Sequence, residues 1–83
     1  MHRTTPQFWD RFNQLPGPVQ DLARKNFELL KQNPRHPSLR FKKVGSFWSA
    51  RVGLSHRALA VEDSDDFVWV WIGDHSEYDH LVG

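Results

Sequence analysis

The 83-residue chain contains no cysteine. A disulfide-stapled secreted scaffold, a thiolate metal site and a cysteine nucleophile are therefore excluded. Long apolar runs are lacking too, because no stretch approaches the roughly 18–20 apolar residues that a membrane-spanning helix requires. The first six residues have no apolar core of the kind found in signal peptides. We therefore expect a cytoplasmic protein with no membrane partner.

Aromatic residues are plentiful, with four Trp, six Phe and a single Tyr, and 39% of the residues are hydrophobic. Apolar side chains that are this dense and patterned argue against disorder. A chain of this length buries only roughly 60% of its unfolded surface, so the core must depend on a few large rings. We expect one domain that spans residues 1–83.

Charge is distributed unevenly along the chain. All eleven Lys and Arg lie in residues 1–57 beside three carboxylates, which gives this segment a net charge of +8. Residues 58–83 hold seven carboxylates and no Lys or Arg, so they carry −7. This asymmetry predicts a basic and an acidic division of the surface, although the two segments would also be expected to pair in the fold. The sequence leaves both alternatives open.

The first third of the chain reads as two helices. Thr5 suits a helix N-cap and Pro6 suits the first helical position. Between residues 18 and 33 the apolar side chains recur at helical spacing. Pro34 stops the pattern, since proline disfavours helix in the residue before it. We predict a helical hairpin over residues 6–33.

Strand-like runs follow the hairpin, at residues 39–44, 47–52, 57–62 and 67–72. Their short connections are typical of antiparallel hairpins. The last run is apolar on both faces, which predicts an interior strand. In the first run apolar and basic residues alternate, which predicts a strand at the edge of the sheet. The sequence therefore predicts an α+β domain, in which the helical hairpin packs on a twisted antiparallel sheet of about four strands. The sheet is expected over residues 39–73, and a polar tail over residues 74–83.

Basic side chains of the predicted sheet are candidates for phosphate binding. Arg51 and Arg57 lie on neighbouring strands joined by a tight turn, and Arg grips phosphate through two parallel hydrogen bonds. In RNA cleavage such a cation neutralises the charge that develops on the scissile phosphate. Lys42 and Lys43 would extend a basic groove. The alternatives are ion pairs with Glu62, Asp74 or Glu77 for the arginines, and a solvated edge strand for the lysines.

The segment after the last strand holds candidates for proton transfer. Histidine side chains in general titrate near neutral pH, and carboxylates stand on both sides of His75 in the sequence. RNA cleavage by the 2′-hydroxyl needs one group to accept that proton and another to protonate the leaving 5′-oxygen. Tyr78 would stack on a base or donate its hydroxyl proton, and Trp48 would offer a second platform for bases. The alternatives are a surface histidine, a ring that covers the end of the sheet, and a core tryptophan.

Neither a metal nor a cofactor is expected. No spacing of potential ligands matches a common zinc or calcium motif. No glycine-rich loop suited to a phosphate cofactor is present.

Three segments together resemble one known family. The first runs from Leu15-Pro16 to Phe41-Lys42, the second covers residues 47–59, and the third covers residues 71–79. In order and spacing they resemble the RelE/ParE superfamily of toxins from type II toxin–antitoxin systems. The resemblance spans nearly the whole chain and implies a helical hairpin packed on a twisted antiparallel sheet.

The resemblance also implies a function. Many members of the family are ribosome-dependent endoribonucleases that cut mRNA in the ribosomal A site without a metal. Their sites use Lys and Arg from the sheet, and often a His or Tyr near the C-terminus. At matching positions the expected RNA-binding residues are Lys42, Lys43 and Arg51. The expected catalytic residues are Arg57, His75 and Tyr78.

The resemblance implies partners and alternatives as well. The expected partners are a cognate antitoxin, the ribosome and mRNA, with promoter DNA bound only through the toxin–antitoxin complex. The ParE branch shares the fold but inhibits DNA gyrase, and a degenerate toxin would only bind its antitoxin. Family members usually begin with a strand, and here only four residues precede Thr5. We therefore expect that strand to be short or missing, with an antitoxin strand added at the open sheet edge.

Overall fold

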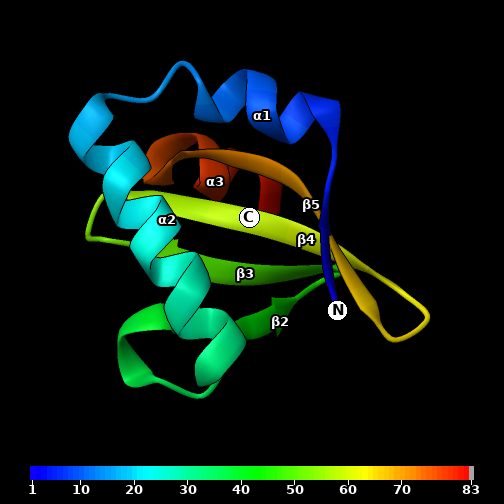
Figure 1. Cartoon of the computed structure of the whole chain (residues 1–83). Coiled ribbons are helices and arrows are strands. Elements are labelled where there is room, and N and C mark those ends of the chain that lie inside the picture. The colour runs from blue at the N-terminus through cyan, green and yellow to red at the C-terminus, as the bar shows by residue number, and fades with distance from the viewer. Residues whose placement is uncertain (83) are drawn as a thin grey trace.

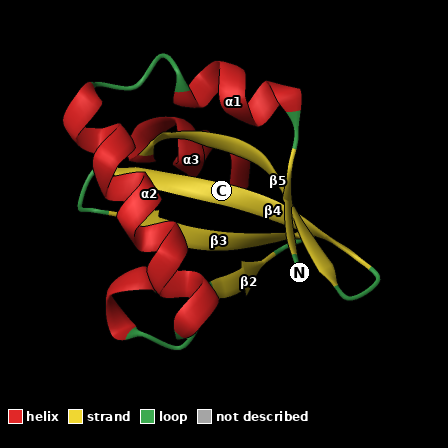
Figure 2. Ribbon diagram, viewed as in Figure 1, coloured by secondary structure: helices red, strands yellow, loops and turns green. Residues whose placement is uncertain are grey.

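The computed structural model describes residues 1–82, which form one sheet with helices on both of its faces (Figure 1, Figure 2). The α-helices are α1 (Pro6–Phe12), α2 (Gly17–Gln32) and α3 (His75–Val82), and a 3-10 turn covers Pro37–Leu39. The strands are β1 (His2–Thr4), β2 (Lys42–Val44), β3 (Phe47–Val52), β4 (His56–Asp63) and β5 (Asp66–Asp74). The α+β class is therefore confirmed.

The sheet differs from the prediction in strand number and in direction. Its order is β1-β5-β4-β3-β2, and β1 pairs in parallel with β5, so the sheet is mixed and five-stranded. The chain thus begins with a strand, and the two helices follow it. A three-residue strand is too short to show a period in the sequence. Because β1 covers β5 over Phe67 to Trp69, the edge that was expected to be open is occupied there.

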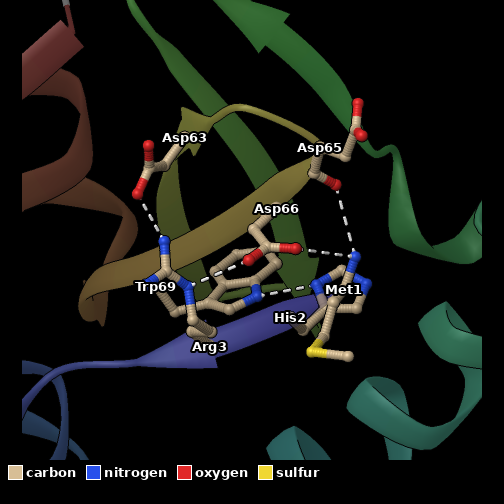
Figure 3. A network of polar contacts seen from close by, with 7 residues as sticks. All are labelled: Met1, His2, Arg3, Asp63, Asp65, Asp66 and Trp69. Carbon is tan, nitrogen blue, oxygen red and sulfur yellow. Dashed lines mark hydrogen bonds and ion pairs between the residues drawn. The ribbon is translucent and has the colours of Figure 1, made fainter.

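Polar contacts hold β1 against the acidic turn between β4 and β5 (Figure 3). Arg3 forms ion pairs with Asp63 and Asp66, the second at 3.2 Å. The Trp69 indole donates a hydrogen bond of 3.0 Å to Nδ1 of His2. At this end of the sheet, residues of the basic segment therefore form ion pairs with residues of the acidic segment. This pairing is one of the two alternatives that the uneven charge distribution left open.

The helical hairpin begins where the sequence indicates. Thr5 caps α1, since its hydroxyl accepts from the Phe8 backbone N–H at 3.2 Å and donates to the Trp69 carbonyl at 3.0 Å. Helix α1 is short and ends at Phe12, four residues before Pro16. Both helices pack on one face of the sheet, which we call the helix face. In Figure 1 α2 crosses in front of the sheet and α3 lies behind it.

The main core lies between the helix face and the α1–α2 hairpin. Its buried side chains are Phe12, Leu30, Leu39, Ala50, Val52, Ala58, Ala60, Trp69 and Ile72. Strand β5 is interior and β2 is an edge, and both positions were predicted. Strand β2 begins at Lys42, later than expected, because the 3-10 turn takes the preceding residues. None of the described helices is long and apolar enough to span a bilayer.

A bulge in β5 sends two tryptophans to opposite faces. Leu59 pairs with Trp71 and Ala60 pairs with Trp69, so one step on β4 matches two steps on β5. Trp69 therefore joins the helix-face core, whereas Trp71 points to the opposite face, which we call the open face. Trp71 and Leu59 are both buried there, outside the main core. A Cβ at Gly73 would lie 2.5 Å from the Trp71 ring, so this position requires glycine.

The predicted polar tail is a helix over its described part, and Gly83 lies outside the described residues. The Asp74 carboxylate accepts from the Glu77 backbone N–H at 2.9 Å, which caps the start of α3. An N-cap residue followed three positions later by Glu is a helix-start signature. The sequence contains this signal at Asp74, so the tail was predictable as a helix. The prediction overlooked it because the segment is short and polar.

Candidate functional site

Strand alternation places a group of polar and basic side chains on the open face. Successive side chains of a strand point to opposite faces, and paired residues on neighbouring strands share a face. Ala50 and Ala58 are paired on the helix face, so the adjacent pair Arg51 and Arg57 lies on the open face. The same alternation places Ser49 there, with its side chain buried. The open-face group is Lys42, Ser49, Arg51 and Arg57.

The two adjacent lysines of β2 face opposite ways. Lys42 pairs with Ser49 and shares the open face with the arginines. Lys43 pairs with Trp48 on the helix face, and its Nζ lies 3.8 Å from a carboxylate oxygen of Glu62. Both lysines were predicted to bind RNA, but only Lys42 lies on the same face of the sheet as the two arginines.

Arg51 and Arg57 form a cross-strand pair of like charges. Each side chain is half-buried and donates to a backbone carbonyl, Arg51 to Gly53 at 3.0 Å and Arg57 to His56 at 2.9 Å. Within residues 1–82 neither guanidinium lies within 4.0 Å of a carboxylate. Like charges placed directly opposite each other destabilise a sheet. A bound anion would remove this repulsion.

The carboxylates that the sequence offered as partners for these arginines are engaged elsewhere. Glu62 accepts from the Trp48 indole and lies near Lys43. Asp74 caps α3, and Glu77 forms an ion pair of 3.3 Å with Arg11. The alternative of internal ion pairing is therefore not realised for Arg51 and Arg57 in the described part of the chain.

Helix α3 brings Tyr78 to the arginine pair. The Arg57 guanidinium carbon lies 5.8 Å from the centroid of the Tyr78 ring, a cation–π arrangement. The start of α3 is fixed by the Asp74 cap and by a hydrogen bond of 2.8 Å from the His75 backbone N–H to the Ser55 carbonyl. Tyr78 is half-buried beside the cation, so its phenol is positioned by secondary structure.

His75 occupies the first turn of α3 and is exposed. Its Nδ1 lies 3.7 Å from a carboxylate oxygen of Asp79, one helical turn further on. The described side-chain contacts link His75 to Asp79 and do not link it to Arg57 or Tyr78. No group of three or more potential metal ligands gathers within residues 1–82.

Trp48, considered as a platform for bases, lies on the helix face. Its ring packs 5.0 Å from Phe41 and 5.4 Å from Phe67, measured between centroids. The aromatic side chain that β3 directs to the open face is Phe47, four residues before Arg51. Sequence reasoning did not select Phe47, although counting in twos back from Arg51 would have found it.

No family model matches the sequence, and no curated protein matches it. Solved structures do resemble the fold. A chain of the RelB–RelE antitoxin–toxin complex from Methanococcus jannaschii superposes with a TM-score of 0.73 at 17% identity, covering 95% of this chain and 98% of the other. A chain of the RelBE2 toxin–antitoxin complex from Mycobacterium tuberculosis gives 0.67 at 19% identity, covering 90% and 96%.

A third similar structure is the YoeB/ParE toxin from Agrobacterium tumefaciens, with a TM-score of 0.66 at 13% identity, covering 89% of this chain and 96% of the other. These likenesses span nearly the full length of each protein. The chain therefore has the RelE/ParE toxin fold, as its sequence indicated. The fold alone does not separate the activities that it supports.

Proposed function

We propose that this protein is the toxin of a type II toxin–antitoxin system and an endoribonuclease that cleaves mRNA on the ribosome. The full-length likeness to chains of two toxin–antitoxin complexes supports the toxin role. The observation that carries the enzymatic part is the Arg51–Arg57 pair, which lacks a carboxylate partner in residues 1–82 and lies beside Tyr78. A phosphate group would satisfy both guanidiniums.

In the proposed reaction the 2′-hydroxyl oxygen attacks the neighbouring phosphorus, and the bond to the 5′-oxygen breaks. The products carry a 2′,3′-cyclic phosphate and a 5′-hydroxyl. Arg57 stabilises the charge that develops on the phosphate, while Arg51 and Lys42 hold the backbone. Lys43 has no part in this account, because it lies on the helix face with Glu62.

Two proton transfers complete the reaction. One group accepts the 2′-hydroxyl proton and another protonates the 5′-oxygen. The Tyr78 ring lies beside the Arg57 guanidinium, so in this proposal its hydroxyl is one of the two groups that exchange a proton at the scissile phosphate. His75 is three residues away on the same helix and supplies the second group in this proposal. These transfers need side-chain groups alone.

The proposed setting is the cytoplasm, with a cognate antitoxin, the ribosome and mRNA as partners, and promoter DNA contacted only through the toxin–antitoxin complex. The antitoxin would inhibit the toxin by covering the open face, where the candidate site lies.

Induction of the chain alone in a bacterial host tests the proposal. Methionine incorporation is expected to fall within minutes, and primer extension on an abundant mRNA should show new ends inside reading frames. The Arg57→Ala variant should lose both effects. Lys25→Ala, which removes an exposed positive charge from α2, is the matched control and should stay toxic. Unbroken mRNA in cells that stop growing would contradict the ribonuclease role.

Inhibition of DNA gyrase without catalysis is the second candidate function. The likeness to a YoeB/ParE toxin favours it, since that structure carries both names. In that case thymidine incorporation would fall before methionine incorporation. A degenerate, harmless toxin was suggested by a missing first strand, and the presence of β1 removes that argument.

A further inference from the structure

Phe47 lies on the open face, apart from the aromatic side chains of the core. It is the first residue of β3, two positions before Ser49 and four before Arg51, so all three share a face. The ring is half-buried. Among the described residues it packs against no other aromatic ring, and it does not join the hydrophobic side chains that pack on the main core. Its neighbour Trp48 has both kinds of contact, on the helix face.

The sheet neighbours of Phe47 on the open face are apolar. Val44 is its partner on β2, and Val61 is its neighbour on β4, because the adjacent pair in that register is Trp48 with Ala60. Val61 in turn pairs with Val68 on β5. These four half-buried side chains form a row across β2 to β5 on the open face. We call this row the valine–phenylalanine row.

The row and the arginine pair lie at opposite ends of one strand. At about 3.3 Å per residue, the four steps from Phe47 to Arg51 cover roughly 13 Å. That length is on the order of four stacked nucleotides at 3.4 Å each, and fewer in an extended strand. Lys42, which pairs with the buried Ser49 midway along β3, supplies an exposed ammonium group between the two ends. The face therefore changes from cationic to apolar along β3.

A single strand of RNA has both of the chemical groups that this face would bind. Its phosphates match Arg51, Arg57 and Lys42, and its unpaired bases have planar faces that stack on aromatic rings. Exposed sheet surfaces that carry aromatic rings are a known way to hold single-stranded RNA. We infer that Phe47 is a base-stacking subsite, which receives a base within about four nucleotides of the phosphate held by the arginine pair. This inference rests on the proposed ribonuclease function.

A partner protein that placed an apolar side chain on the row is the competing occupant. Such a contact would involve the row but would need neither a base nor the nearby arginines. The cations at the far end of β3 favour a ligand that has anionic and planar parts in one chain, which is why RNA is the occupant we propose. An oligomer that keeps the phosphates but lacks the bases distinguishes RNA from a partner protein as the occupant.

The probe is a short single-stranded RNA with 2′-O-methyl riboses, which cannot be cleaved because the attacking hydroxyl is blocked. It is titrated at millimolar concentrations into the full chain, and binding is followed by NMR. The Phe47 ring signals are expected to move upfield through stacking. Phe47→Leu should weaken binding about tenfold, as expected for the loss of one base–aromatic stack. Phe47→Tyr should bind as the parent protein does.

Two controls show whether a loss of affinity in Phe47→Leu comes from base stacking. An oligomer of the same length without bases should bind the parent and Phe47→Leu equally, because only phosphates remain. Trp48→Phe, which changes a ring on the helix face, should leave the affinity for the intact RNA unchanged. Equal affinity of the parent and Phe47→Leu for the intact RNA, or no shift of the Phe47 ring, overturns the subsite.

The same titration separates the subsite from the function on which it rests. If Phe47→Leu binds normally while Arg51→Ala loses binding, the subsite is wrong and the phosphate site stands. If Arg51→Ala also binds normally, the proposed phosphate site is wrong, and the inference about Phe47 is overturned with it. Near-identical circular dichroism spectra of all variants would show that each is folded.

Discussion

Arg51 and Arg57 are direct cross-strand partners on β3 and β4, and their guanidiniums are held by carbonyl groups rather than by carboxylates within residues 1–82. Such an arrangement costs stability, since like charges face each other across a sheet. The chain thus keeps two cations together on a face that also receives Tyr78 from α3. This relationship is the basis of the proposed function.

The roles of the Tyr78 ring and hydroxyl can be separated by two substitutions. Tyr78→Phe keeps the ring near Arg57, so the free energy of unfolding should change by less than about 0.5 kcal/mol. If the hydroxyl transfers a proton, the rate of mRNA cleavage on ribosomes should fall about 100-fold or more. Tyr78→Ala should lose both the rate and the cation–π contact. Cleavage by Tyr78→Phe at the parental rate would remove the hydroxyl from the mechanism.

An apolar cavity between the helical hairpin and the helix face, partly open to solvent, offers a test of packing. It has a volume of about 90 Å³, and its lining includes Phe12, Ala50 and Ala58. Ala58→Val should fill part of this space and stabilise the protein by about 1 kcal/mol, as seen from urea unfolding. Ala60 is a matched control, because it lies on the same face of β4 but does not line the cavity. Ala60→Val should be destabilising through overpacking. A loss of stability in both variants would mean that the cavity cannot accept the added methyl groups.

Gly73 and Trp71 give a sharp steric prediction. The Trp71 ring lies where a Cβ at position 73 would be, 2.5 Å away, so Gly73→Ala must displace the ring or the strand. We expect a loss of about 1–3 kcal/mol in the free energy of unfolding. Gly17 begins α2 with open space around it, and Gly17→Ala should be neutral or slightly stabilising. Equal stability of the parent and Gly73→Ala would contradict the placement of Trp71.

Sequence reasoning reached some parts of this molecule and missed others for physical reasons. The Thr5 cap, the interior position of β5 and the neighbouring strands of Arg51 and Arg57 follow from local patterns, which the sequence states directly. Strand β1 was expected to be short or missing because its pairing comes from contacts with β5, more than sixty residues away. Which lysine faces the arginines depends on register, and a shift of one residue reverses the answer.

Helix α3 was not predicted, for a different reason. Its start signal is local and present in the sequence at Asp74 and Glu77, but the absence of an apolar stripe concealed it. None of its described side chains is fully buried, and its position depends on the cap and on the Arg11–Glu77 ion pair. The contact between Tyr78 and Arg57 follows from that placement, so it was not predictable from periodicity.

The lowered pKa of His2 leads us to expect that the stability of the protein depends on pH. Burial lowers the pKa of His2 below its usual 6.5, and the positive charges of the chain's amino group and Lys31 lower it further. The folded state therefore favours the neutral ring, whose Nδ1 accepts from Trp69. The unfolded chain binds the proton more readily, so the stability present above about pH 6.5 is lost as the pH falls toward the lowered pKa.

Thermal unfolding between pH 7.5 and pH 5 measures this effect. The parent protein should lose stability as the solution becomes more acidic, and His2→Phe should lose less over the same range. If His2→Phe loses stability with falling pH as steeply as the parent protein does, groups other than His2 cause the pH dependence.

The most direct test of the central claim is primer extension on ribosome-bound mRNA with purified protein, comparing the parent with Arg57→Ala and Lys25→Ala. The account predicts new mRNA ends inside the reading frame with the parent and with Lys25→Ala. Arg57→Ala should produce at least about 100-fold less cleavage, since it lacks the cation at the scissile phosphate. Cleavage by Arg57→Ala at the parental rate, or intact mRNA with all three proteins, would contradict the account.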